Sequence, residues 1–317
     1  MRALLVVNPT ATTTRPRTRE VLVSALSAEL ELEVAETTHR GHAVELGTRA
    51  TREGFDVVVA LGGDGTVNEV VNGMLVDGPG EGVPALGVVP GGSANVFIRA
   101  LGGPRDPVDA TGLLLEALRE GRRRTIGLGR ANDRWFIFCA GYGLDAAVVG
   151  RVEQARGRGR TATPGLYVRS AVAQYASGPE RRATSVELKI ETPDASATVA
   201  DAAEPTGRFA AVIVQNCSPW TYLGPRPVNP CPEASFDDGL DLLALRAWRL
   251  PSTLRTVWQI LSPKPDPRGR QIVRRHDLPG FVLRSDPPMA AQVDGDYLGE
   301  LGEMRFTSVP GALRVVV

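Results

Sequence analysis

Short runs of apolar residues alternate with amphipathic stretches along the first part of the chain. The apolar runs predict strands at residues 3–7, 32–36, 56–61 and 85–89. Apolar positions with helical spacing predict helices at residues 17–30, 42–53, 67–75, 94–101 and 108–120. Strands that alternate with helices are typical of a parallel sheet covered by helices. We therefore predict an α/β domain over residues 1–125.

The hydrophobic pattern changes near Thr125. Beyond it, turn residues separate runs that predict strands at 135–143, 185–192, 208–216, 240–248, 281–286, 290–296, 304–309 and 312–317. Many short strands with few helices are typical of an antiparallel sandwich or barrel. We predict a second domain, an antiparallel β-sandwich over residues 126–317, and leave open whether its last strand returns to the first domain.

Two stretches of the second part have helical periodicity, residues 167–176 and 252–261. The second stretch is amphipathic and contains Trp258. An amphipathic helix of this kind either packs its apolar face on a core or lies on a membrane surface. Core packing is the commoner case, and we predict it here.

The third predicted strand ends in a glycine turn, in the stretch VVVALGGDGTVNE at residues 57–69. Glycine permits positive φ and lets a ligand lie against the backbone, so we expect both at Gly62, Gly63 and Gly65. Thr66 and Glu69 have the spacing of a capping box at the start of a helix. Exposed amides at a helix N-terminus bind anions, and phosphate is the usual one.

Asp64 stands within this turn, although a carboxylate repels phosphate. The conflict disappears if Mg²⁺ lies between them, or if Asp64 meets a hydroxyl that must lose its proton. Both arrangements belong to phosphoryl transfer. The alternative is a glycine turn that serves only the geometry between strand and helix.

Two further polar loops follow predicted strands. Residues 8–12 follow the first strand, and residues 90–95 follow the fourth and precede a helix that we expect Ser93 to cap. In an open parallel sheet, ligands bind beyond the carboxyl ends of the strands. The three loops therefore predict one nucleotide site. Neither a Walker A loop nor a GxGxxG fingerprint is present.

The composition of the chain limits the classes of molecule that it is expected to bind. Lys and Arg total 36, as do Asp and Glu, so no global field attracts nucleic acid. Arginine-rich stretches at 119–124 and 151–160 predict solvated loops, with contact to anionic headgroups as the alternative. Cys139, Cys217 and Cys231 lack paired spacing and predict reduced thiols in a cytosolic protein. The chain contains no apolar run long enough to span a membrane.

The motifs together resemble bacterial lipid kinases of the diacylglycerol kinase type, which are relatives of sphingosine and ceramide kinases. Five motifs carry the resemblance in order: GGDGTVNEVVNG (62–73), PGGSANVFIRALG (90–102), AGYGLDAAVV (140–149), SFDDGLDLL (235–243) and VDGD (293–296). GGDG turns alone also occur in NAD kinases and phosphofructokinases. The resemblance implies two domains. The first is Rossmann-like, similar to that of NAD kinases and phosphofructokinases, and binds nucleotide; the second is a β-sandwich that binds lipid.

The resemblance also implies the site residues. ATP would contact Asn8, Pro9, Thr10, Ala11, Thr12, Thr37, Gly62, Gly63, Asp64, Gly65, Thr66, Val67, Asn68, Glu69, Gly92, Ser93 and Asn95. A structural Mg²⁺ would be bound around Ser235, Asp238 and Leu240, partly through backbone carbonyls and water. The position of the catalytic base falls on Asp296, with Asp294 as the alternative and Asp64 as the group that organises metal or hydroxyl.

Three departures from the family pattern bear on these assignments. The first loop reads NPTAT where the family has a serine and a glycine, so Thr12 would supply a hydroxyl. Asp296 is one methylene shorter than the glutamate usual there, so the acceptor hydroxyl must approach more closely. Residues 217–227 lack the family's glycine cluster, which leaves the identity of the lipid open.

We therefore predict an ATP- and Mg²⁺-dependent lipid kinase, with diacylglycerol as the first candidate substrate and phosphatidic acid as product. The protein would be cytoplasmic, with transient contact to the inner face of the cell membrane through the arginine-rich loops. A homodimer is left open. The alternatives are an NAD kinase-like enzyme and a non-catalytic lipid-binding regulator.

Overall fold

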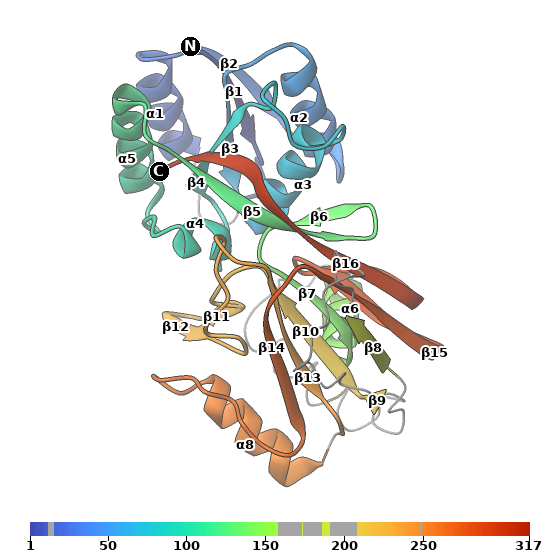
Figure 1. Cartoon of the computed structure of the whole chain (residues 1–317). Coiled ribbons are helices and arrows are strands. Elements are labelled where there is room, and N and C mark those ends of the chain that lie inside the picture. The colour runs from blue at the N-terminus through green and yellow to red at the C-terminus, as the bar shows by residue number, and fades with distance from the viewer. Residues whose placement is uncertain (12–15, 158–172, 174–185, 191–207, 248) are drawn as a thin grey trace. The chain divides into compact units, whose positions relative to one another are not determined.

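A computed structural model describes residues 1–11, 16–157, 173, 186–190, 208–247 and 249–317. The chain divides into two compact units (Figure 1). Unit 1 comprises Met1–Leu128 together with Pro310–Val317, and unit 2 comprises Gly129–Val309. The residues of the helix predicted at 167–176 lie outside the described parts of the chain, apart from residue 173.

Unit 1 contains a parallel sheet in the strand order β4-β3-β1-β2. Its strands are β1 (Arg2–Val7), β2 (Glu31–Glu36), β3 (Val57–Gly62) and β4 (Ala85–Pro90). All residues of β3 and β4 are buried, as expected for parallel strands covered on both faces. Near the C-terminus, Val315 pairs in parallel with Leu86, so the end of the chain adds a strand to this sheet.

Helices cover both faces of the sheet (Figure 1). They are α1 (Pro16–Ser27), α2 (His42–Arg52), α3 (Asp64–Met74), α4 (Val96–Ala100) and α5 (Pro107–Glu120). Leu26 of α1 and Leu114 of α5 share a core with Leu5 and Val59 of the sheet. Helices α2 and α3 pack against each other through glycines, since a Cβ on Gly73 would lie 2.0 Å from a backbone oxygen of α2.

Unit 2 is built from antiparallel strands around a large core, beside a smaller cluster of Cys231, Ala234 and Leu243. The strands are β6 (Arg134–Phe136), β7 (Cys139–Gly143), β8 (Val186–Ile190), β9 (Arg208–Phe209), β10 (Ala211–Gln215), β11 (Thr221–Leu223), β12 (Arg226–Val228), β13 (Leu240–Leu245), β14 (Ile272–Leu278) and β15 (Gly280–Val293). Two long strands, β5 (Arg123–Ala131) and β16 (Asp296–Val316), span the division between the units.

Strand β15 changes partners along its length. Its first half pairs with β8 and its second half with β7, with an irregularity between Arg284 and Met289. Aromatic rings from three strands fill the interior, with Phe281 stacked on Phe306 at 4.9 Å and Phe136 edge-on to Phe306. The predicted fold class, an α/β domain followed by an antiparallel β-sandwich, is confirmed.

Helix α6 (Leu144–Gly157) follows β7, and helix α8 (Leu250–Ile260) lies between β13 and β14. The prediction that α8 packs on a core is wrong, because only Thr256 and Ile260 of this helix are buried. The helix lies in the connection between two strands, and the Asn229 amide donates to its Ile260 carbonyl at 3.3 Å.

Within the residues that the structure describes, no helix has the length and apolar character of a membrane span.

Candidate active site

The two glycine loops of unit 1 meet at the carboxyl edge of the sheet. The Gly91 amide donates to the Gly62 carbonyl at 2.8 Å. A Cβ on Gly92 would lie 2.7 Å from the Cα of Gly63, which is closer than side chains approach backbone. The loops after β3 and β4 are therefore in backbone contact, and only glycine fits at Gly92.

The expectation of positive φ at Gly62, Gly63 and Gly65 is wrong. None of the three has a positive φ, and Gly63 lies at −85° in the extended region. Close packing explains two of them: a Cβ on Gly62 would lie 2.7 Å from the side chain of Thr66, and Gly63 faces Gly92. Gly65 is exposed, with open space where its Cβ would be, so a ligand can approach the backbone there.

The predicted capping box is also wrong. Helix α3 begins at Asp64 with Gly63 as its N-cap, so Thr66 lies inside the first turn. The Thr66 hydroxyl accepts from the Asn8 amide side chain at 3.0 Å. The Glu69 carboxylate accepts from the Gly41 backbone amide at 3.1 Å, at the start of α2. These side chains join the loops after β1 and β2 to α3.

Ser93 does not cap the next helix either. It is exposed, and α4 begins after Asn95, which has φ of 48°. The Asn95 side chain accepts from the Gly92 amide at 2.9 Å and donates to the Gly92 carbonyl at 2.8 Å. Asn95 therefore holds the glycine loop closed upon itself.

The Asp64 carboxylate joins the two glycine loops. Its Oδ1 atom accepts from the Phe97 amide in the first turn of α4 at 3.1 Å. Burial raises the pKa of Asp64, while backbone amides of Phe97, Val96 and Asn95 lower it. The charge of Asp64 thus lies against the positive end of a helix.

The remaining predicted nucleotide contacts follow the same strand ends. Asn8 follows β1, where its amide donates to the Leu61 carbonyl, and Thr37 follows β2, where its amide donates to the Val7 carbonyl. Pro9 and Thr10 are exposed, and Ala11 is half-buried. Val67 and Asn68 are buried within α3, and Thr12 lies outside the described residues.

In unit 2, Asp294 is a buried residue of the turn between β15 and β16. It is 7% exposed and has φ of 47°. Its carboxylate accepts from the amides of Ile137, Phe138 and Cys139 at 2.7, 3.1 and 2.9 Å. Burial raises the pKa of Asp294 to about 7, although the three amides and the charge of Arg134 lower it. The acceptor oxygens of Asp294 are therefore occupied by backbone.

Asp296 is the more accessible carboxylate of the VDGD turn. Its side chain is 25% exposed and forms an ion pair with Arg134, which stands at the start of β6. Arg134 could not be predicted as a site residue from the sequence, since nothing in the local pattern links it to a turn 162 residues away.

The predicted Mg²⁺ segment is the turn before β13. The Ser235 hydroxyl accepts from the Asp237 amide at 3.2 Å, and the Asp238 side chain is exposed. Leu240 begins β13 and pairs with Leu278. Hydroxyl and carboxylate oxygens at an exposed turn fit Mg²⁺, which keeps several waters of its own.

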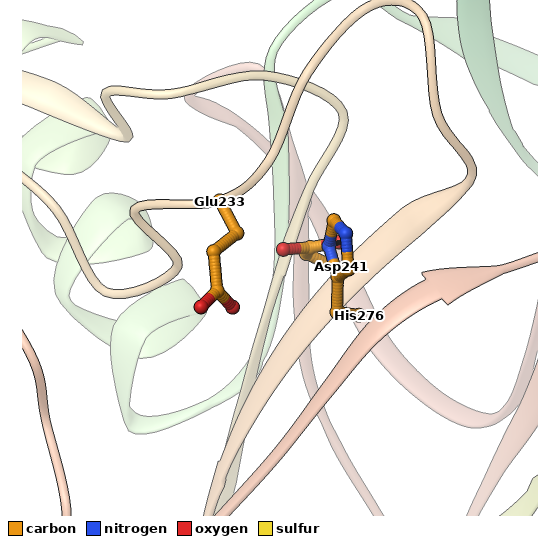
Figure 2. Close-up of side chains that lie close together, drawn as sticks. All are labelled: Glu233, Asp241 and His276. Atoms are coloured by element: carbon orange, nitrogen blue, oxygen red, sulfur yellow. Dashed lines mark hydrogen bonds and ion pairs between the residues drawn. The ribbon is translucent and has the colours of Figure 1, made fainter.

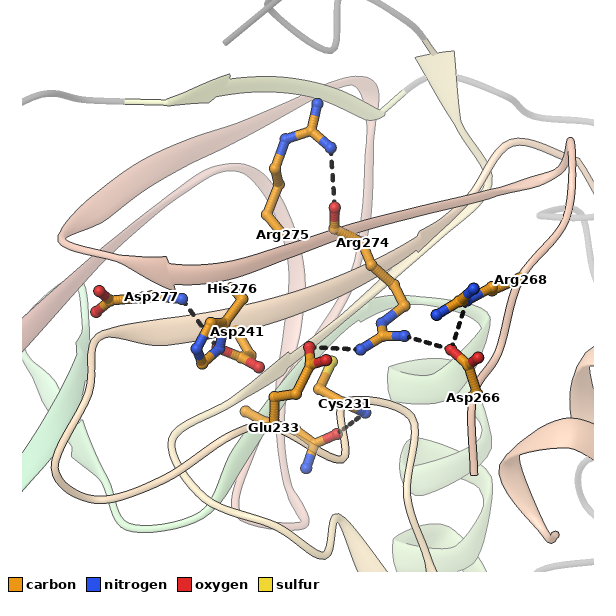
Figure 3. Close-up of polar contacts among 10 residues, drawn as sticks. Cys231, Glu233, Asp241, Asp266, Arg268, Arg274, Arg275, His276 and Asp277 are labelled. Atoms are coloured by element: carbon orange, nitrogen blue, oxygen red, sulfur yellow. Dashed lines mark hydrogen bonds and ion pairs between the residues drawn. The ribbon is translucent and has the colours of Figure 1, made fainter. Parts of the chain in front are cut away.

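Among the described residues, one group of side chains has metal-ligand spacing, and it adjoins this turn. Potential ligand atoms of Glu233, Asp241 and His276 lie within 4.8 Å of one another (Figure 2). Asp241 is 1% exposed, and its Oδ1 meets His276 Nδ1 at 2.8 Å and the Asp277 amide at 3.1 Å. Glu233 pairs with Arg274 at 2.7 Å (Figure 3). All three side chains have protein partners, so we assign them a structural role.

Comparison with known proteins agrees with this arrangement. The sequence profile of the family described as "Diacylglycerol kinase catalytic domain" matches residues 2–131. The diacylglycerol kinase of Bacillus subtilis (strain 168) is 28% identical over 315 residues, which cover 95% of this chain and 91% of the relative. The diacylglycerol kinase of Staphylococcus aureus (strain bovine RF122 / ET3-1) is 37% identical over 144 residues, 45% of this chain and 44% of the relative.

Solved structures agree at the level of the fold. A crystal structure of a diacylglycerol kinase from Bacillus anthracis str. Sterne matches with a TM-score of 0.71 and 19% identity. The match covers 99% of this chain and 96% of that one. Residues 2–131 thus match the diacylglycerol kinase catalytic domain, the relatives named above are similar to the chain, and the solved structure shares its fold.

Proposed function

We propose that the protein transfers the γ-phosphate of ATP to the hydroxyl of a neutral lipid, with diacylglycerol as acceptor and phosphatidic acid as product. One observation carries the proposal: the backbone contact of Gly63 with Gly92 beside the N-terminus of α3. The names of the relatives support diacylglycerol as the acceptor.

In this proposal unit 1 binds the nucleotide. The amides of Thr66 and Val67 donate to the Gly63 carbonyl, so the exposed Gly65 amide is the candidate donor to phosphate oxygens at the N-terminus of α3. Gly65 leaves the space above the backbone open. Asn8 and Glu69 fix the neighbouring loops to α3 through the contacts with Thr66 and Gly41. A pre-formed cradle lowers the barrier because positioning dominates phosphoryl transfer.

Unit 2 would supply the general base and bind the lipid. Asp296 suits proton acceptance better than Asp294, because its carboxylate is partly exposed while that of Asp294 accepts from three backbone amides. Arg134 fixes the direction of the Asp296 carboxylate. A carboxylate that accepts the proton late in the reaction needs position more than a high pKa.

Mg²⁺ would shield phosphate charge during transfer. A second, structural Mg²⁺ would be held by Ser235, Asp238 and the backbone at Leu240. Asp64 either helps to hold the ion at the nucleotide or only fixes the two glycine loops, and these roles differ in the effect of substitution.

The test is an assay of the purified protein with labelled ATP and Mg²⁺ against diacylglycerol, sphingosine, ceramide and NAD. Labelled phosphatidic acid is the expected product. Label on NAD alone would establish the NAD kinase-like alternative. No labelled product from any acceptor, with lipid binding retained, would establish the non-catalytic lipid-binding regulator.

The acceptor lies in a bilayer, so the proposal includes transient contact with the inner face of the cell membrane by a cytoplasmic protein. Acidic neighbours of Arg122 argue against the predicted membrane contact at residues 122–124. Arg122 pairs with Glu120 at 2.6 Å and with Glu116 at 3.7 Å. The side chain of Arg156 and residues 158–160, the other predicted contact, lie outside the described residues.

A further inference from the structure

The connection between β13 and β14 is much longer than the two strands require. Leu245 pairs with Ile272, so residues 246–271 form a single excursion from an antiparallel pair. Antiparallel neighbours of this kind are usually joined by about 2–5 residues. Helix α8 occupies the middle of this excursion, outside the strands (Figure 1).

Helix α8 exposes a continuous apolar stripe. Leu250, Leu254, Val257 and Trp258 are 54%, 60%, 46% and 74% exposed. Their spacing places them on one side of a helix with about 3.6 residues per turn. Thr256 and Ile260, on another side, are buried. The stripe is thus an apolar face directed away from the core of unit 2.

The surroundings of the stripe are basic. Arg249 and Arg255 are exposed on or beside the helix, and Lys264, Arg268 and Arg270 are exposed after it. Asp266 is the sole acidic residue in the sequence of 246–271, and it already pairs with Arg268 at 2.8 Å and Arg274 at 3.2 Å. The surface therefore combines an apolar face with excess positive charge.

The excursion is held at its base (Figure 3). Arg274 of β14 pairs with Glu233 at 2.7 Å and with Asp266. The Arg246 amide donates to the Gln271 carbonyl at 2.9 Å, and the Asn229 amide to the Ile260 carbonyl at 3.3 Å. Contacts at both ends therefore fix which side of α8 faces outward.

We propose that α8 docks unit 2 on the surface of an anionic bilayer. Leu250, Leu254, Val257 and Trp258 enter the boundary between headgroups and acyl chains, while Arg249 and Arg255 contact lipid phosphates. An apolar face with tryptophan and flanking arginines is the composition of helices that lie in this interface. Each basic residue near an anionic surface adds electrostatic attraction. The purpose of this docking rests on the proposed lipid substrate, but its test does not.

The experiment measures co-sedimentation of the full chain with vesicles of phosphatidylcholine containing phosphatidylglycerol, and with phosphatidylcholine alone. The test variant is Leu254→Ser with Trp258→Ser. The matched control is Val108→Ser with Leu113→Ser, which changes two residues of α5 that are 52% and 50% exposed. A third variant, Arg249→Gln with Arg255→Gln, tests the charge. Thermal unfolding checks that each variant folds.

We expect the α8 variant to bind anionic vesicles at least about ten-fold more weakly than wild type, and the α5 control to bind like wild type. The arginine variant should lose affinity for anionic vesicles, and added salt should weaken wild-type binding. Tryptophan fluorescence should shift to the blue on vesicle addition, and Trp258→Phe should remove the shift.

Equal binding by wild type and the α8 variant would overturn the proposal. So would failure of wild type to bind any vesicle. A concentration-dependent dimer that the α8 variant abolishes, without vesicle binding, would assign the stripe to a second copy of the chain. Because these assays measure binding without turnover, their outcome is independent of whether diacylglycerol is the acceptor.

Discussion

The carboxylate of Asp64, in the first turn of α3, accepts a hydrogen bond from the backbone amide of Phe97, in the first turn of α4, at 3.1 Å. One acidic side chain thus ties the N-termini of two helices that follow neighbouring strands. This contact lets the two roles of Asp64, chemical and structural, be separated by substitution.

Asp64→Asn keeps an oxygen that can accept from Phe97 but removes the charge. If Asp64 organises metal or hydroxyl, kcat should fall by about 10³-fold while thermal stability stays near that of wild type. Asp64→Ala is the comparison, and it should also lose about 1–3 kcal/mol of stability because the Phe97 amide loses its acceptor. Wild-type turnover by Asp64→Asn would leave Asp64 as a residue that only fixes the loops.

Gly92→Ala should separate the two glycine loops. The added Cβ would lie 2.7 Å from the Cα of Gly63, so one loop must move. A shift of about 1 Å in a positioning element can cost about 10² in rate, and we expect kcat/KM for ATP to fall by roughly that factor. Gly112→Ala in α5 is the control, because nothing lies within 4 Å of its Cβ. An unchanged kcat/KM in Gly92→Ala would show that the contact between the two glycine loops is not needed for catalysis.

Asp296→Asn and Asp294→Asn should fail in different ways. The first should lower kcat by about 10²–10⁴-fold with a stable fold, since it removes the proposed base. The second places an amide NH₂ among three backbone donors and should lower the free energy of unfolding by about 1–3 kcal/mol. Urea unfolding and steady-state kinetics measure the two effects. If Asp294→Asn is as stable as wild type but has lost turnover, Asp294 and not Asp296 is the general base.

Asp145 provides a test of pH dependence. Burial raises the pKa of this carboxyl to about 6, against a hydrogen bond from Gln292 at 2.9 Å that lowers it. A pKa raised by folding gives a stability contribution that is present at low pH and lost as pH rises through about 6. Asp145→Asn keeps an acceptor for Gln292 and removes the ionisation.

The stability of Asp145→Asn relative to wild type should therefore increase from pH 4.5 to pH 7.5, by about 2 kcal/mol. Urea unfolding of both proteins at the two pH values measures it. If the difference in free energy of unfolding between Asp145→Asn and wild type is the same at both pH values, Asp145 ionises in the folded protein as it does in the unfolded chain.

The strands and the strand-end loops could be predicted from sequence because both depend on local pattern. Apolar runs such as that of β3 identify buried strands, and glycines directly after them mark a turn. The reason for those glycines could not be predicted, since Gly63 faces Gly92 only after β3 and β4 pair. The same holds for two side-chain partnerships that only the tertiary structure creates. Asp64 accepts from the Phe97 amide, and Asp296 pairs with Arg134.

Helix α8 illustrates a second limit. Its periodicity predicts a helix with one apolar face, but periodicity does not say what lies against that face. The answer depends on its position in a connection that leaves the strands of unit 2. Helix starts were misplaced for a related reason: Thr66 and Ser93 have capping chemistry, while the helices begin at Asp64 and after Asn95.

The pairing of Val315 with Leu86 bears on how the protein folds during synthesis. Residues of β4 leave the ribosome long before Val315 is made, so the edge of β4 stays uncovered while the whole of unit 2 is translated. Arg314, which donates to the backbone carbonyls of Glu81 and Val83, arrives equally late. An uncovered strand edge can pair with other chains. Nascent chains stalled before residue 310 should therefore aggregate, or recruit chaperones, more than chains that contain residues 310–317.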